Sequence, residues 1–245
     1  MIFIKLLFIR HGDPDYEADS LTEKGWSEAR LLAQRMAQTP IQAFYVSPLG
    51  RAKDTASFTL EQKKQQAEEL PWLQEFHAPI PDFHTGEPRL PWDQLPEDWT
   101  TEPKYYDKAH WSKTLPMLQG HVEEEVKRVQ QGLDQILHKH GYQRDQNFYR
   151  AVLPNENTLA FFCHFGVSCV MVGHLLGISP MILWHNFCAL PTSVTTLATE
   201  ERRSGIASFR MLSFGDTAHL YAAGESPAFA GRFCETFANT AQRHD

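Results

Sequence analysis

Two arginines and two histidines, Arg10, Arg51, His11 and His164, stand at or shortly after the ends of short apolar runs in this chain. An arginine guanidinium presents a planar fork of donors that suits phosphate oxygens. A neutral imidazole is a nucleophile that can accept a phosphoryl group without help from a metal. Brought together, these residue types would form a pocket for a phosphoryl group. Such a pocket also needs a carboxylic acid that protonates the leaving oxygen and later activates water, a role worth about 10²–10⁴ in rate.

The apolar runs that precede these residues predict buried strands. They cover residues 2–9, 43–46 and 158–163, and each is short and rich in Ile, Leu, Val or Phe. Amphipathic helical patterns follow the first two runs, and residues 166–176 also have a helical pattern. Alternating strands and helices imply a largely parallel sheet whose carboxyl ends share one edge, where such sheets place their ligands. The predicted fold class is therefore α/β, a three-layer α/β/α arrangement with a mostly parallel central sheet.

Residues 71–120 differ in composition from the rest of the chain, because prolines alternate there with tryptophans. Proline at this density excludes long helices and central strands. We therefore expect one domain over residues 1–245 with an insertion at about 77–120 that forms a lid. Further along, the patterns predict a helix over 122–137, a hairpin at a sheet edge from the runs 193–199 and 206–212, and a terminal helix over 227–241.

Composition and charge limit the classes of partner. The chain has a net charge of -7, which argues against nucleic acid and against an anionic membrane, because both are bound through an excess of Lys and Arg. A small phosphorylated substrate needs only a local positive site. The run at the start of the chain contains Lys5 and is too short for a membrane span, so a protein of the cytoplasm is expected. The four cysteines and the scattered histidines lack the spacing of a metal site, and no cofactor is expected.

Four motifs together resemble the histidine phosphatase superfamily, in its phosphoglycerate-mutase-like branch and of the broad-specificity phosphatase type. They are Arg10-His11-Gly12, Leu21-Thr22-Glu23-Lys24-Gly25, Ser47-Pro48-Leu49-Gly50-Arg51-Ala52 and Cys163-His164-Phe165-Gly166, and they occur in the order that the family has.

The resemblance implies a role for each matching residue. His11 would be the nucleophile that forms a phosphohistidine, while Arg10, Arg51 and His164 would hold the phosphoryl oxygens. In this branch the general acid follows the second helix within a Leu-x-Glu stretch, which Leu73-Gln74-Glu75 matches, so Glu75 is the candidate. Two other carboxyls nearby, Asp82 and Glu87, are the alternatives.

The chain also departs from the family in ways that bear on the reaction. Phosphoglycerate mutases continue the first motif with Glu-Ser and carry an Arg-Arg pair in the insertion, whereas this chain has Asp13-Pro14 and no such pair between residues 76 and 120. A metal-independent phosphomonoesterase acting on a small phosphorylated metabolite is therefore expected in preference to a mutase. A third possibility is a non-catalytic phosphate-binding protein that keeps the pocket without the acid.

Overall fold

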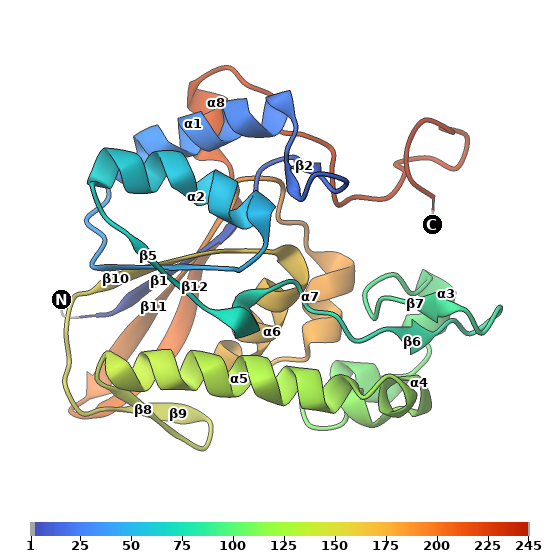
Figure 1. Cartoon of the computed structure of the whole chain (residues 1–245). Helices are drawn as coiled ribbons and strands as arrows, with labels where there is room; N and C mark the ends of the chain where they lie inside the picture. The colour runs from blue at the N-terminus through green and yellow to red at the C-terminus, as the bar shows by residue number, and fades with distance from the viewer. Residues whose placement is uncertain (1–2, 245) are drawn as a thin grey trace.

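A mixed sheet of eight strands forms the centre of the molecule in a computed structural model that describes residues 3–244 (Figure 1). The strand order is β5-β4-β10-β1-β11-β12-β9-β8. Ile2, the first residue of the predicted run 2–9, lies outside the described residues. The strands are β1 (Lys5–Arg10), β4 (Ala43–Val46), β5 (Ala67–Glu69), β8 (Tyr142–Asp145), β9 (Phe148–Ala151), β10 (Thr158–Cys163), β11 (Val194–Arg203) and β12 (Ile206–Asp216).

The four strands β5, β4, β10 and β1 are parallel to one another. Arg10 at the end of β1 is opposite Cys163 at the end of β10, and Phe162 is opposite Val46 at the end of β4. The residues that follow these three strands therefore leave the sheet at one edge, as the sequence predicts. The strands β11, β12, β9 and β8 pair in antiparallel fashion beyond β1.

Helices cover both faces of the sheet, which confirms the predicted fold class (Figure 1). On one face lie α1 (Glu23–Ala37) and α2 (Gly50–Lys63), with the short α8 (Ala218–Ala222) beside α1. On the other face lie α5 (Val122–Lys139) and α6 (Phe165–Leu176), followed by α7 (Pro180–Asn186). Because side chains alternate across a strand, β1 supplies Leu7 and Ile9 to the core under α1 and α2, and Leu6 and Phe8 to the core under α5 and α6.

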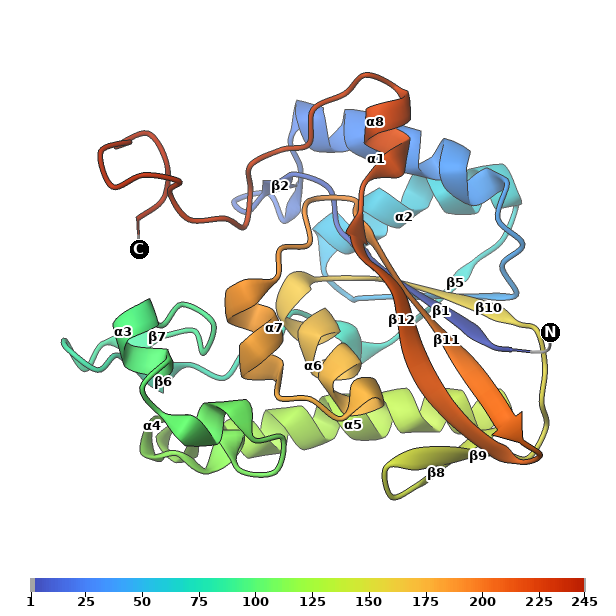
Figure 2. The same ribbon diagram turned by 180° about the vertical axis from the view of Figure 1, so that it is seen from behind.

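The region between α2 and α5 contains only short elements, as its prolines require. Its single-turn helices bury Trp99, Tyr105 and Trp111 in the same core that α5 and α6 share. This insertion lies near the carboxyl edge of the sheet, on the α5 side (Figures 1 and 2). The element η1 (Pro71–Leu73) precedes the insertion. The elements of the insertion are β6 (Ile80–Pro81), β7 (Pro88–Arg89), α3 (Pro96–Trp99), η2 (Pro103–Tyr106), η3 (Trp111–Lys113) and α4 (Leu115–Gln119). A second small pair, β2 (Pro14–Asp15) and β3 (Ser20–Leu21), precedes α1.

Two expectations about the later part of the chain are wrong. The hairpin β11–β12 is not at a sheet edge, because β11 pairs with β1 and the short hairpin β9–β8 extends the sheet beyond β12. The terminal helix predicted over 227–241 is absent, and residues 225–244 carry neither helix nor strand. Gly231 adopts a φ of +84° there, which no right-handed helix allows, and the Ala228 N–H bonds to the Glu28 carboxylate of α1 instead of to a helical carbonyl. Within residues 3–244, no helix is both long and apolar enough to span a membrane.

Candidate active site

His11 lies directly after β1 with 2% of its surface exposed. Its Nδ1 lies 2.7 Å from the carbonyl oxygen of Gly12, and because a carbonyl can only accept, Nδ1 carries the proton. The other ring nitrogen, Nε2, then holds the lone pair. Burial, with help from the positive charge of Arg10, lowers the pKa of His11 well below its ordinary value. The side chain is therefore a neutral imidazole with an available nucleophilic nitrogen.

The guanidinium groups of Arg10 and Arg51 lie near this imidazole, since both lower its pKa. Arg10 donates from Nη1 to the carbonyl oxygens of Ala189 at 2.6 Å and Ala230 at 3.3 Å. Arg51, in the first turn of α2, donates to Asp19 Oδ1 at 2.6 Å. Each arginine is thus fixed by neighbours at one nitrogen and keeps other donors for a ligand.

His164 follows β10 and packs against His11, with ring centroids 5.1 Å apart. Its Nε2 lies 2.7 Å from the hydroxyl oxygen of Ser47, which follows β4. That hydroxyl oxygen also accepts a hydrogen bond from the backbone N–H of Leu49 at 3.3 Å, so its own hydrogen is free to go to His164. When that hydrogen goes to Nε2, the proton of the neutral His164 ring lies on Nδ1. Burial lowers the pKa of His164 as well, which keeps the ring neutral.

Three buried nitrogens around His11 have no hydrogen-bond partner within the described part of the chain: Nε of Arg10, Nε of Arg51 and Nδ1 of His164. A buried donor without a partner costs about 1–3 kcal/mol, so native proteins leave only a few, usually scattered through the fold. Two arginine donors and an imidazole nitrogen, all unpartnered at one place, indicate a site whose natural occupant is an acceptor-rich anion. A phosphoryl group, with its several oxygens, matches this demand.

Glu75 follows η1 and lines the same cavity as Arg10, His11 and Arg51. Its Oε1 accepts hydrogen bonds from the backbone N–H groups of Phe76 at 2.8 Å and Val167 at 3.0 Å, and its Oε2 accepts one from Gly166 at 3.2 Å. Burial raises the pKa of the carboxyl, and these three bonds only partly oppose the rise. The carboxyl is therefore one that can hold a proton and release it.

Gly166 makes this position of Glu75 possible. A Cβ atom at residue 166 would lie 2.7 Å from Glu75 Oε1 and 2.7 Å from the ring of Trp92. Only glycine therefore lets the N-terminus of α6 approach the carboxylate so closely, and that helix end favours negative charge.

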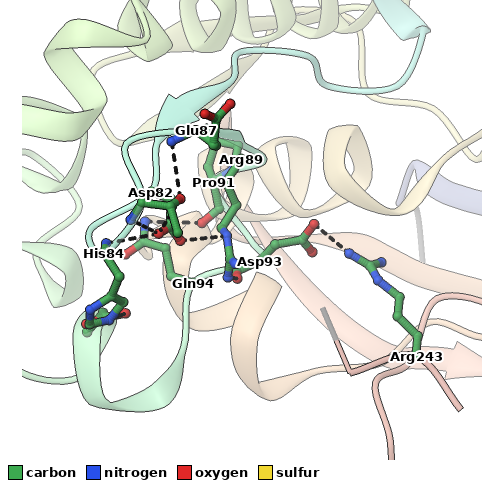
Figure 3. A network of polar contacts seen from close by, with 10 residues as sticks. Asp82, His84, Glu87, Arg89, Pro91, Asp93, Gln94 and Arg243 are labelled. Atoms are coloured by element: carbon green, nitrogen blue, oxygen red, sulfur yellow. Dashed lines mark hydrogen bonds and ion pairs between the residues drawn. The ribbon is translucent and has the colours of Figure 1, made fainter. Parts of the chain in front are cut away.

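The two alternative acids lie elsewhere. Asp82 is 2.9 Å from Arg89 Nε and accepts hydrogen bonds from the backbone N–H groups of His84 and Thr85 within the insertion (Figure 3). Glu87 is exposed in the same turn. Neither lines the cavity that contains His11, so the structure brings Glu75, and not Asp82 or Glu87, to the imidazole.

The cavity has a volume of about 470 Å³, and several residues that line it were not predicted as site residues from the sequence. Trp92 of the insertion, Phe165 of α6 and Trp184 of α7 contribute aromatic faces, while Arg232 and Arg243 come from the C-terminal segment. Arg232 was missed because a helix was expected over residues 227–241, and Arg243 belongs to no motif.

Asp19 was missed as well, because it belongs to no motif. It lies between β2 and β3 with a positive φ of 46°, and its Oδ2 accepts a hydrogen bond from the Gly50 N–H at 2.7 Å while Oδ1 pairs with Arg51. An Asp in a turn whose partner is distant in sequence gives no local signal.

Within residues 3–244, no group of three or more His, Cys, Asp and Glu side chains is placed to hold a metal ion.

In a comparison with protein families, the sequence model of the histidine phosphatase superfamily (branch 1) matches residues 6–211 of the chain. No curated protein matches this chain by sequence.

Solved structures share the fold. A phosphoserine phosphatase from Entamoeba histolytica, crystallised as a mutant with phosphoserine, is 20% identical with a TM-score of 0.57, over 89% of this chain and 99% of that one. A phosphoglycerate mutase from Bacillus anthracis is 19% identical with a TM-score of 0.59, over 91% and 98%. A mycobacterial glucosyl-3-phosphoglycerate phosphatase is 15% identical with a TM-score of 0.57, over 87% and 99%. At these identities the likeness shows the fold alone.

Proposed function

The chain belongs to the histidine phosphatase superfamily, branch 1, and on this premise we propose that it is a phosphomonoesterase that works through a phosphohistidine at His11. The observation that carries the proposal is the set of three buried, unpartnered nitrogens around a neutral imidazole, on Arg10, Arg51 and His164. Donors fixed in advance around a phosphoryl group stabilise the charge on its equatorial oxygens, which is most of what this reaction asks of a protein.

In the first step, His11 Nε2 attacks the phosphorus atom and the bond from phosphorus to the ester oxygen breaks. Glu75, protonated, gives its proton to that leaving oxygen, so the alcohol departs neutral. In the second step, the Glu75 carboxylate takes a proton from water while the water oxygen attacks phosphorus. The bond between phosphorus and Nε2 breaks, inorganic phosphate leaves, and both side chains return to their starting forms.

Phosphoryl transfer between substrates, as in a mutase, is the second candidate, because one of the similar structures is a phosphoglycerate mutase. A mutase has to keep its phosphorylated intermediate away from water and return the group to a second hydroxyl. This chain lacks the arginine pair in the insertion that the resemblance associates with mutases. We therefore favour water as the acceptor.

The experiment is hydrolysis of 4-nitrophenyl phosphate without added metal by the unmodified chain, by His11→Ala and by His138→Ala. His138 is exposed in the last turn of α5, so its replacement is a matched control. We expect steady turnover by the unmodified chain and by the control, and loss of turnover in His11→Ala with its circular dichroism unchanged. Equal turnover in all three would overturn the proposal. A single burst of nitrophenol without turnover would instead favour the phosphate-binding protein.

A further inference from the structure

The C-terminal segment, residues 225–243, is tied to the catalytic edge of the sheet at several points. Lys24 of α1 pairs with Glu225 at 2.7 Å, and the buried Glu28 accepts a hydrogen bond from the Ala228 N–H at 2.9 Å. Gly231 packs against the Arg10 guanidinium so closely that a Cβ there would lie 2.4 Å from Nη2. The segment lies outside the 6–211 range matched by the family model.

The same segment also reaches the insertion. Arg243 Nη2 pairs with Asp93 Oδ2 at 2.7 Å, and Figure 3 shows these two side chains extending toward each other from opposite sides. Because the insertion and the C-terminal segment both line the cavity, this ion pair joins its two outer walls.

More positive than negative side chains line the cavity. Four arginines line it, but only two acids, Glu75 and Asp93. Arg10 and Arg51 belong to the phosphoryl pocket around His11, and Arg243 is neutralised by Asp93. The guanidinium of Arg232 remains in excess.

Arg232 is held in place but weakly neutralised. Its guanidinium lies over the Phe229 ring at 4.1 Å, and its Nη1 is 3.3 Å from the mostly exposed Glu235 carboxylate. Its Nε is buried and has no hydrogen-bond partner among residues 3–244. The Arg232 side chain as a whole is 38% exposed and lines the cavity, so its guanidinium can offer a fork of donors to a planar anionic group of the ligand.

We propose that Arg232 binds a second anionic group of the substrate, which is then a phosphomonoester that also carries a carboxylate or a second phosphate. The inference rests on the proposed function, since it places the phosphoryl group at His11. The flat faces of Trp92, Trp184 and Phe233 line the cavity with Arg232 and would contact the body of such a substrate.

The test compares three probes that differ in one substituent: phenyl phosphate, 4-carboxyphenyl phosphate and 1,4-phenylene bisphosphate. Their dissociation constants are measured by calorimetry in a His11→Ala background, which prevents turnover. We expect at least one of the two probes with a second anionic group to bind about tenfold more tightly than phenyl phosphate. This is the size expected for a hydrogen bond to a charged group. The preferred probe identifies the second group as a carboxylate or a phosphate.

Adding Arg232→Gln should abolish this preference, whereas adding Arg210→Gln should preserve it. Arg210 is an exposed arginine on β12 paired with Glu200, so its replacement removes the same charge away from the cavity. Equal affinity for all three probes, or a preference that survives Arg232→Gln, would overturn the inference. These affinities are independent of turnover. Failure of the unmodified chain to hydrolyse phenyl phosphate would count against the proposed function and not against Arg232.

Discussion

At the scale of single residues, burial sets the ionisation of the two groups that would exchange the phosphoryl group and the proton. Burial lowers the pKa of the His11 imidazole below 6.5 and raises that of the Glu75 carboxyl above 4.5, so each shift favours the form that the first step needs. Both shifts have the same cause, the loss of water around a charged form. The two side chains therefore form a matched acid and nucleophile.

A pH profile follows from these directions. The value of kcat/KM for an alkyl phosphate should rise as His11 loses its proton, at a pH below 6.5, and fall as Glu75 loses its proton, at a pH above 4.5. Glu75→Gln should remove the alkaline fall and lower the rate by about 10²–10⁴. Glu87→Gln, the exposed control, should keep the profile of the unmodified chain. An alkaline fall that persists in Glu75→Gln would assign the proton to another group.

Much of the site could be predicted from the sequence at this scale. The structure brings Arg10, His11, Arg51 and His164 together because each ends or follows a parallel strand or opens the next helix, a position that apolar runs reveal. The choice of Glu75 as the general acid depended on the Leu-x-Glu motif, because nothing else in the nearby sequence distinguishes Glu75 from Asp82 or Glu87.

At the scale of elements, α2 begins without a side-chain cap of its own, because its N-cap residue is Leu49. Asp19, from the turn between β2 and β3, accepts the hydrogen bond from Gly50 in its place and also fixes Arg51. The Asp19 carboxylate thus pairs with a backbone N–H at the start of α2 and also orients Arg51, the residue proposed to bind phosphate. No sequence pattern connects the two because the pairing depends on the tertiary fold.

Replacing this carboxylate should affect stability and substrate binding together. For Asp19→Ala we expect a free energy of unfolding lower by about 1 kcal/mol, the usual cost of a lost cap, and a raised KM for aryl phosphates. Urea denaturation and steady-state kinetics measure the two effects. Glu17→Ala, which alters an exposed carboxyl in the same turn, is the control. An unchanged KM in Asp19→Ala would show that Arg51 keeps its place without Asp19.

At the scale of the whole molecule, Glu28 joins three distant segments. It is fully buried in α1, and it accepts hydrogen bonds from the Asp13 N–H at 3.0 Å, after the first motif, and from the Ala228 N–H at 2.9 Å, in the C-terminal segment. The prediction of a terminal helix failed for this reason. The spacing of apolar residues does not reveal that the Ala228 N–H is hydrogen-bonded to a carboxylate two hundred residues away in sequence.

Removing one acceptor from this junction should loosen the C-terminal segment. In Glu28→Gln the amide NH₂ would face one of the two backbone donors and leave it unpaired, at a cost of about 1–3 kcal/mol in the free energy of unfolding. Hydrogen exchange should become faster in residues 225–232, whereas Glu23→Gln, an exposed change on the same helix, should leave it slow. Equal protection in both variants would show that Glu28 does not hold the segment.

The central claim is that the phosphoryl group passes through His11, and trapping that intermediate tests it most directly. The unmodified chain is mixed with an aryl phosphate, quenched in alkali within milliseconds, digested and mapped by mass spectrometry. The account predicts one phosphoryl group on the peptide that contains His11, stable in alkali and lost in acid. Full turnover with no phosphoryl group on His11, or with one on another residue, would contradict it.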